Sequence, residues 1–182
     1  MRLSATTFKI FKDWDLATLC RELPAAQVEG VEFRISAGHR HGVELDTTDT
    51  ARGVMREQLA AAPLVPCSIA TGCMFHYPEA GKVEENIRTA EQAIRLASDL
   101  GCPRIRVFGN NLPQGAEPDD VAVQVGRALR QLGPVGEQHG VDVLLEMHSD
   151  FNDWWLVRRA VEIANHRAVG VVYNWDKRDL GK

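Results

Sequence analysis

Short runs of β-branched and aliphatic residues alternate along this chain with longer amphipathic stretches. This alternation predicts repeated strand–helix units, which build a parallel sheet rather than a β-sandwich or a helix bundle. We expect six strands, over Leu3–Phe8, Gly30–Ile35, Leu64–Ala70, Arg104–Phe108, Val141–Met147 and Val169–Asn174. The pattern therefore indicates an α/β protein, built either as an open sheet or as a closed barrel.

Helical periodicity fills several of the gaps between these strands. Helices are expected over Asp15–Leu23, Val83–Leu100, Val121–Leu132 and a stretch that runs to Ala164. In Val83–Leu100 the apolar residues recur every three or four positions, which favours one face packed on the sheet. Gly101 and Pro103 should end that helix, and Gly133-Pro134 should end the next one in the same way.

The first expected strand argues against an open nucleotide-binding sheet. No glycine-rich phosphate loop follows Leu3–Phe8, so a (β/α)8 barrel is favoured. Such a barrel needs about eight strands, whereas the sixth expected strand ends at Asn174, eight residues before Lys182. We therefore expect residues 1–182 to form a single incomplete barrel domain with its C-terminal βα units missing, unless a second chain completes it.

Composition excludes several classes of partner and compartment. The formal charge is −4 and the basic residues are scattered, so neither nucleic acid nor an anionic membrane is indicated. The longest apolar run, Leu59–Pro66, is broken by proline and too short to span a bilayer. The N-terminus does not resemble a signal peptide, and the four cysteines form no C-x-x-C pair. These features predict a cytoplasmic protein with reduced thiols.

Several of the expected strands end in a pair of residues two positions apart, most of them polar. Because side chains alternate between the faces of a strand, such residues point the same way, into the barrel mouth where active sites lie. An isolated inward charge is costly to bury, which favours a functional reason for this pattern. The pairs are Glu32 and Arg34, Arg106 and Phe108, Glu146 and His148, and Asn174 and Asp176.

The Glu146 and His148 pair has the clearest chemistry. A carboxylate and an imidazole on one strand face can share a divalent ion or a substrate hydroxyl, or they can be a polar pair on an edge strand. Asn174 either donates an amide oxygen to the same ion or caps the following turn. Arg106 either contacts a ligand oxygen or holds Glu32 or Glu146 in place.

Loop residues give weaker candidates. His76 lies beside aromatic residues after the third strand and is the best histidine for a binding role. The segment His39–His41 resembles an exposed, solvated tip. The pair Trp154 and Trp155 is expected to pack on the barrel wall, although a sugar-stacking platform is an alternative.

Taken together, these segments resemble the xylose isomerase-like TIM-barrel family of sugar isomerases and epimerases, to which endonuclease IV-type repair enzymes are related. The resemblance covers most of the chain and is specific for the superfamily rather than for one substrate. It rests on Gly30–Arg34, Phe75–Gly109, Leu144–His148 and Val169–Asn174.

The resemblance implies a divalent metal ion, Mg²⁺, Mn²⁺, Co²⁺ or Zn²⁺, held by acidic and histidine ligands after the last four strands of the barrel. Only the first of these ligand positions carries the family's residue type, at Glu146. The resemblance implies that Glu146 is both a metal ligand and an acid/base. The second falls on Asn174 where the family usually has Asp, and the remaining two would lie beyond Lys182. By the same likeness, the residues that bind or surround the substrate are Glu32, Arg34, His76, Arg106 and His148.

The implied reaction is proton transfer next to a carbonyl of a small sugar or polyol, through an enediolate. One alternative is an endonuclease IV-like phosphodiesterase at abasic sites, which the net charge of −4 disfavours. Another is a catalytically inactive binding module of the same fold. No nucleic-acid or membrane partner is expected, and self-association into a homo-oligomer is compatible with the sequence.

Overall fold

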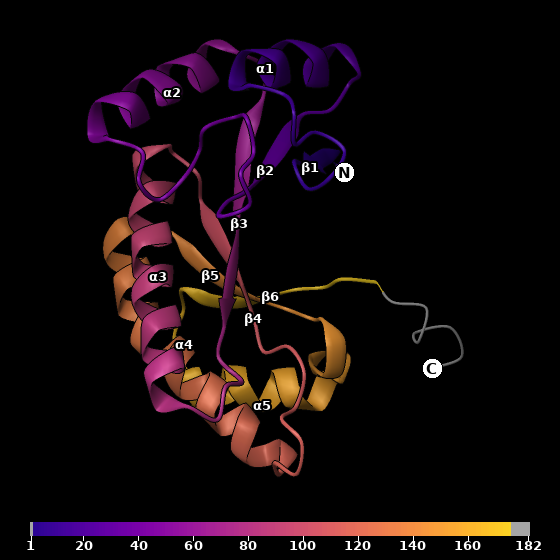
Figure 1. Cartoon of the computed structure of the whole chain (residues 1–182), viewed down its shortest axis with the longest axis vertical. Helices are drawn as coiled ribbons and strands as arrows, with labels where there is room; N and C mark the ends of the chain where they lie inside the picture. Colours follow the sequence, from indigo (N-terminus) through magenta and orange to yellow (C-terminus); the bar gives the residue numbers. More distant parts are fainter. Residues whose placement is uncertain (1, 176–182) are drawn as a thin grey trace. The chain divides into compact units, whose positions relative to one another are not determined.

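The structure is a computed structural model that describes residues 2–175. Within this range six strands alternate with helices, and their order in the sheet follows their order in the chain, β1 to β6 (Figure 1). The pairings β1–β2, β2–β3 and β5–β6 are parallel, which confirms the predicted parallel α/β fold. The strands are β1 (Ser4–Thr6), β2 (Gly30–Arg34), β3 (Val65–Met74), β4 (Arg104–Phe108), β5 (Asp142–Glu146) and β6 (Val169–Val172).

The chain divides into two compact units. The first comprises residues up to 72 together with 92–105 and 139–141, and it holds α1 (Leu16–Ala25) and α2 (Asp49–Ala61), which contact each other. Close strand pairing there depends on Gly30, because a Cβ at this position would lie 3.1 Å from the Cβ of Ser4. Its core is apolar and includes the fully buried Phe33 and Ile69.

The second unit comprises residues 73–91, 106–138 and the described residues from 142 onward. It holds β5, β6, most of α4 (Pro118–His139), the 3₁₀ turn η1 (Ser149–Asn152) and α5 (Trp154–Ala164), while α3 (Ala80–Asp99) contributes to both units. Helix α5 contacts β6 and η1 (Figure 1). The strands β5 and β6 pair in register from Val143 with Val169 to Glu146 with Val172.

Helix α2 was not expected from the sequence. It begins after Thr48, whose hydroxyl accepts a hydrogen bond from the Ala51 backbone N–H at 3.3 Å. Leu59 is its buried residue, and Met55 and Ala51, one and two turns earlier, are half-buried, so its apolar stripe is narrow.

Helix α4 runs through Gly133-Pro134 to His139, so the expected end at Leu132 is wrong. Gly133 serves packing instead, because a Cβ there would lie 2.5 Å from the Cγ of His166. Pro134 is exposed, and the helix tolerates it at the cost of one backbone hydrogen bond.

Several strand boundaries also differ from the expectation, most of all the end of β3. Strand β3 continues beyond Ala70 to Met74, which brings His76 within two residues of its end. Strand β1 is limited to Ser4–Thr6. Among the described residues, no helix is both long enough and apolar enough to cross a membrane.

Packing of α4 on α5 yields a test at Gly126. A Cβ at Gly126 would lie 2.7 Å from the Ala160 carbonyl oxygen and 2.7 Å from the Ile163 Cβ. Gly126→Ala should therefore lower the free energy of unfolding by about 2 kcal/mol, measured by urea denaturation. The control is Gly53→Ala in α2, where nothing lies within 4 Å, and this change should raise stability by about 0.5–1 kcal/mol. Equal effects of the two substitutions would contradict this packing.

Candidate functional site

The centre of the candidate site is the carboxylate of Glu146 at the end of β5. Glu146 is buried, with 8% of its surface exposed. Arg106 Nη1, from β4, donates a hydrogen bond to Glu146 Oε2, and Asn174 Nδ2 donates one to Glu146 Oε1 at 2.7 Å. Glu146 of β5 pairs with Val172 of β6. Asn174 follows Val172 by two residues, so its side chain points to the same face and reaches Glu146. Both oxygens of the carboxylate are therefore held in fixed directions.

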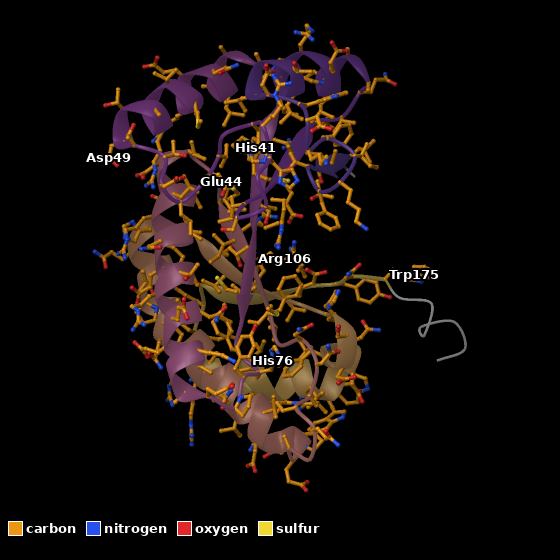
Figure 2. The ribbon with its side chains drawn as sticks, viewed as in Figure 1. His41, Glu44, Asp49, His76, Arg106 and Trp175 are labelled. Carbon is orange, nitrogen blue, oxygen red and sulfur yellow. The ribbon has the colours of Figure 1, made fainter. Side chains whose placement is uncertain are left out.

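Phe108 supports the polar groups on either side of it. The guanidinium carbon of Arg106 lies 4.5 Å from the centroid of the Phe108 ring, within the range of a cation–π contact. His148 meets the same ring edge-on at 5.3 Å between centroids, and its Nδ1 lies 2.9 Å from Ser149 Oγ. Figure 2 shows Arg106 on β4. The ends of β4 and β5 thus carry one connected group of Arg106, Phe108, Glu146 and His148.

The ion pair between Arg106 and Glu146 is largely removed from water. Their side chains are 15% and 10% exposed, respectively. Two opposite charges in such a place stabilise each other strongly, because each would be costly to bury alone. Only a group that offers matching charge or hydrogen bonds can replace either partner.

His76 follows β3 in the same unit (Figure 2). Its ring packs on Tyr77 with centroids 4.4 Å apart, and its Nδ1 is buried with no hydrogen-bond partner among the described residues. Burial lowers the pKa of His76, so the ring is neutral near pH 7. Gln124 Nε2 fixes this segment by donating to the carbonyls of Phe75 and Tyr77 at 2.7 and 2.8 Å. A role for His76 in substrate binding stays a prediction.

Glu32 and Arg34 lie on β2 in the first unit. The guanidinium of Arg34 donates to the backbone carbonyl of Thr71, and also to that of Ala70 at 3.5 Å. Arg34 thus ties the end of β2 to the middle of β3. A role for Glu32 and Arg34 in substrate binding stays a prediction.

The expectation of an exposed tip at His39–His41 is wrong. His39 is 8% exposed and His41 is 2% exposed. Glycines with positive φ flank them, Gly38 at 65° and Gly42 at 73°, and these turns fold the segment inward. Figure 2 shows His41 and Glu44 on this segment between β2 and α2. The two glycines are the sequence feature that could have indicated this burial.

His41 is locked in one neutral form. The Val43 backbone N–H donates to His41 Nδ1 at 3.0 Å, so the ring hydrogen is on Nε2, which lies 3.3 Å from Thr7 Oγ1. Thr7 Oγ1 also accepts from the Arg34 backbone N–H at 2.9 Å. Burial, with His39 nearby, lowers the pKa of His41 to about 4. This network joins the ends of β1 and β2 and was not anticipated from the sequence.

The two tryptophans at the start of α5 do not pack into a wall. Trp154 is 60% exposed and Trp155 is 37% exposed. The expectation that they pack on the barrel wall is therefore wrong for Trp154. Trp155 instead lines a surface pocket with Asp150 and Asp153.

The described residues fit a metal ion only in part. Glu146 and Asn174 carry a carboxylate and an amide oxygen, which are ligand types of an oxygen-rich coordination shell, but here Asn174 turns its amide nitrogen toward Glu146. Within residues 2–175 no group of three or more His, Cys, Asp or Glu side chains is placed to hold an ion. Asp176, the third candidate at this strand end, lies outside the described residues.

Comparisons with known proteins agree on the fold. A family model described as "Xylose isomerase-like TIM barrel" matches residues 20–176. Among solved structures, the chain is similar to the IolI protein with a bound zinc atom, at 15% identity and a TM-score of 0.77, over 94% of this chain and 62% of that one. A search of curated proteins finds no match.

Two further solved structures are sugar epimerases. One is the 3-keto-D-glucoside 4-epimerase YcjR from E. coli, at 14% identity and a TM-score of 0.75, over 95% of this chain and 68% of that one. The other is D-psicose 3-epimerase in the presence of D-fructose, at 10% identity and a TM-score of 0.76, over 95% and 63%. The chain thus spans between 62% and 68% of the length of these three structures.

Burial of the Arg106 and Glu146 pair yields a test of stability. Arg106→Met should lower the free energy of unfolding by about 3 kcal/mol, because it leaves the Glu146 charge buried without its partner. The control is Arg159→Met, which removes the partner of Asp119 from an exposed ion pair, with side chains 45% and 55% exposed. This change should affect stability little. Similar losses from both substitutions, measured by urea denaturation, would contradict the burial of the first pair.

Burial of His41 yields a test of pH dependence. The pKa of His41 in the folded chain, about 4, lies below its ordinary value of 6.5, so the unfolded chain binds this proton more readily. His41 should therefore cost the protein up to about 3 kcal/mol of stability as the pH falls from 6.5 to 4. His41→Asn keeps an acceptor near Val43 but cannot titrate, so its stability should fall less over this range. Parallel curves for the two proteins would show that His41 does not titrate this way.

Proposed function

This chain belongs to the xylose isomerase-like TIM barrel family, and on that premise we propose that it serves as a metal-dependent isomerase or epimerase of a small sugar or polyol. The reaction would move a proton at a carbon next to a carbonyl, through an enediolate. The observation that carries the proposal is the buried carboxylate of Glu146, held by Arg106 and Asn174 at the end of β5.

Glu146 is the proposed acid/base. A carboxylate can abstract a proton efficiently only if it is positioned within hydrogen-bond distance of the reacting carbon or oxygen. The bonds from Arg106 and Asn174 restrict the Glu146 carboxylate to one orientation before substrate arrives. This preorganisation supports a role in proton transfer rather than a purely structural one.

The neighbouring side chains are proposed to bind and orient the substrate. Arg106 carries positive charge beside Glu146 and can hold a carbonyl or hydroxyl oxygen that becomes negative during the reaction. His148, held by Phe108 and Ser149, and the neutral ring of His76 can each hydrogen-bond to a sugar hydroxyl. Glu32 and Arg34, in the first unit, stay proposed as substrate-binding residues.

A divalent ion, Mg²⁺, Mn²⁺, Co²⁺ or Zn²⁺, is part of the proposal, as the zinc atom in the IolI structure suggests by family likeness. When bound, such an ion stabilises negative charge on the substrate oxygens next to the reacting carbon. Glu146 and Asn174 would supply two of its ligands, and the others would come from residues outside those described. The complete activity is thus proposed for a barrel longer than the described residues.

Proton exchange with solvent tests the proposal directly. D-Fructose incubated with the protein and Mn²⁺ in D₂O should lose the proton signal at a carbon next to its carbonyl, followed by ¹H NMR. Glu146→Gln should slow this exchange by about 100-fold or more, because it removes the acid/base while keeping the shape of the side chain.

The matched control is Glu162→Gln on α5. Glu162 forms an exposed ion pair with Arg158, so this variant should exchange the proton at the wild-type rate. Exchange that is equally fast in Glu146→Gln would remove Glu146 from the mechanism. Cleavage of abasic duplex DNA without any sugar exchange would favour the phosphodiesterase alternative.

A further inference from the structure

A surface pocket of about 300 Å³ lies between the loops that follow β4 and β5. Its walls come from the loop before α4, the first residue of α4, the turn η1 and the beginning of α5. The lining residues are Leu112, Pro118, Asp150, Asn152, Asp153, Trp155 and Leu156. None of these residues belongs to the group around Glu146, so the pocket is a separate feature of the same unit.

The pocket is held open by contacts beneath it. Phe151 is fully buried against Gly109, where a Cβ would lie only 2.2 Å from the Phe151 ring. The Leu112 backbone N–H donates to Asp150 Oδ2 at 2.8 Å, and the Phe151 N–H donates to the Asn110 carbonyl at 3.4 Å. These bonds fasten the loop after β5 to the loop after β4, so the pocket is formed before any ligand binds.

The chemistry of the walls is amphipathic. Trp155 exposes 37% of a large aromatic surface next to the aliphatic side chains of Leu112 and Leu156. Asp153 precedes α5 at the capping position, yet its side chain makes no capping hydrogen bond. Asp150 uses Oδ2 for the Leu112 N–H and retains a second oxygen. The pocket thus combines one flat apolar wall with carboxylate acceptors.

We propose that this pocket binds a neutral pyranose ring. A pyranose has an apolar C–H face that can lie on the Trp155 ring, and a rim of hydroxyls that can donate to Asp150 and Asp153. The two carboxylates disfavour an anionic ligand. The N-termini of α4 and α5, at Pro118 and Trp154, place partial positive charge at the pocket, which offsets the carboxylates and lessens the preference for a cation.

The pocket's position links it to the candidate site. Asp150 follows Glu146 by four residues, and His148 lies between them in the chain. A sugar unit at Trp155 would therefore also contact Asp150, on the segment that follows β5 and carries His148. Binding of a pyranose in this pocket does not depend on the proposed function. The further inference that this pyranose is a second sugar unit of the substrate rests on the proposed function.

Indole N–H signals in ¹H–¹⁵N NMR spectra test the proposal, since the chain has four tryptophans that substitution can assign. Titration with methyl β-D-glucopyranoside should shift the Trp155 signal saturably. Trp155→Ala should abolish saturable binding, and Trp155→Phe should retain weaker binding. Asp153→Asn should weaken affinity about 3- to 10-fold through loss of a charge-assisted acceptor. The matched control is Trp154→Ala, since Trp154 does not line the pocket, and it should bind like wild type.

Three results would overturn the proposal. The first is the absence of a saturable shift, and the second is binding that persists unchanged in Trp155→Ala. The third is saturation of the same indole signal by tetramethylammonium chloride but not by the glucoside, which would identify a cation site. Glu146→Gln separates this proposal from the proposed function, because it should lose proton exchange with D-fructose and still bind the glucoside. Loss of glucoside binding in Glu146→Gln would contradict the independence of the pocket.

Discussion

The candidate site depends on one buried ion pair, between Arg106 at the end of β4 and Glu146 at the end of β5. A lone carboxylate that is only 10% exposed would lose much of its hydration, and Arg106 together with Asn174 replaces that hydration with fixed hydrogen bonds. The same bonds determine the direction in which the carboxylate points. Stability and chemistry are therefore coupled at this position, because the contacts that make the buried charge tolerable also orient it.

The surrounding residues extend this arrangement outward in the second unit. Phe108 contacts both Arg106 and His148, so one aromatic ring positions a cation and an imidazole beside Glu146. Beyond them, the loop after β5 is fastened to the loop after β4 through Phe151 and Gly109 and forms the Trp155 pocket. The strand ends supply the charged groups, and the loops supply the larger binding surface, as expected when a rigid sheet carries variable loops.

Much of the fold could be predicted from the sequence because strand and helix periodicity is local. The six strands and the parallel sheet follow from that pattern, and the alternation of faces placed Arg106, Glu146 and Asn174 on one side before any contact was known. The helix α2 was missed because its apolar stripe of Ala51, Met55 and Leu59 is narrow, and of these three only Leu59 is buried. The Gly133-Pro134 pair wrongly predicted a helix end. Glycine is needed at position 133 because a Cβ there would clash with His166, and this contact between distant residues cannot be read from local sequence.

The site was less predictable than the fold for the same reason. Burial of His39 and His41 depends on turns at Gly38 and Gly42 that pack the segment against the end of β1.

The most direct measurement of the central claim is a double-mutant cycle on the free energy of unfolding, with Arg106→Met, Glu146→Leu and the two substitutions combined. A coupling energy of about 2 kcal/mol or more is predicted, because each single substitution leaves one buried group without its partner. Additive effects, within about 0.5 kcal/mol, would show that the two side chains do not stabilise each other and would contradict the account.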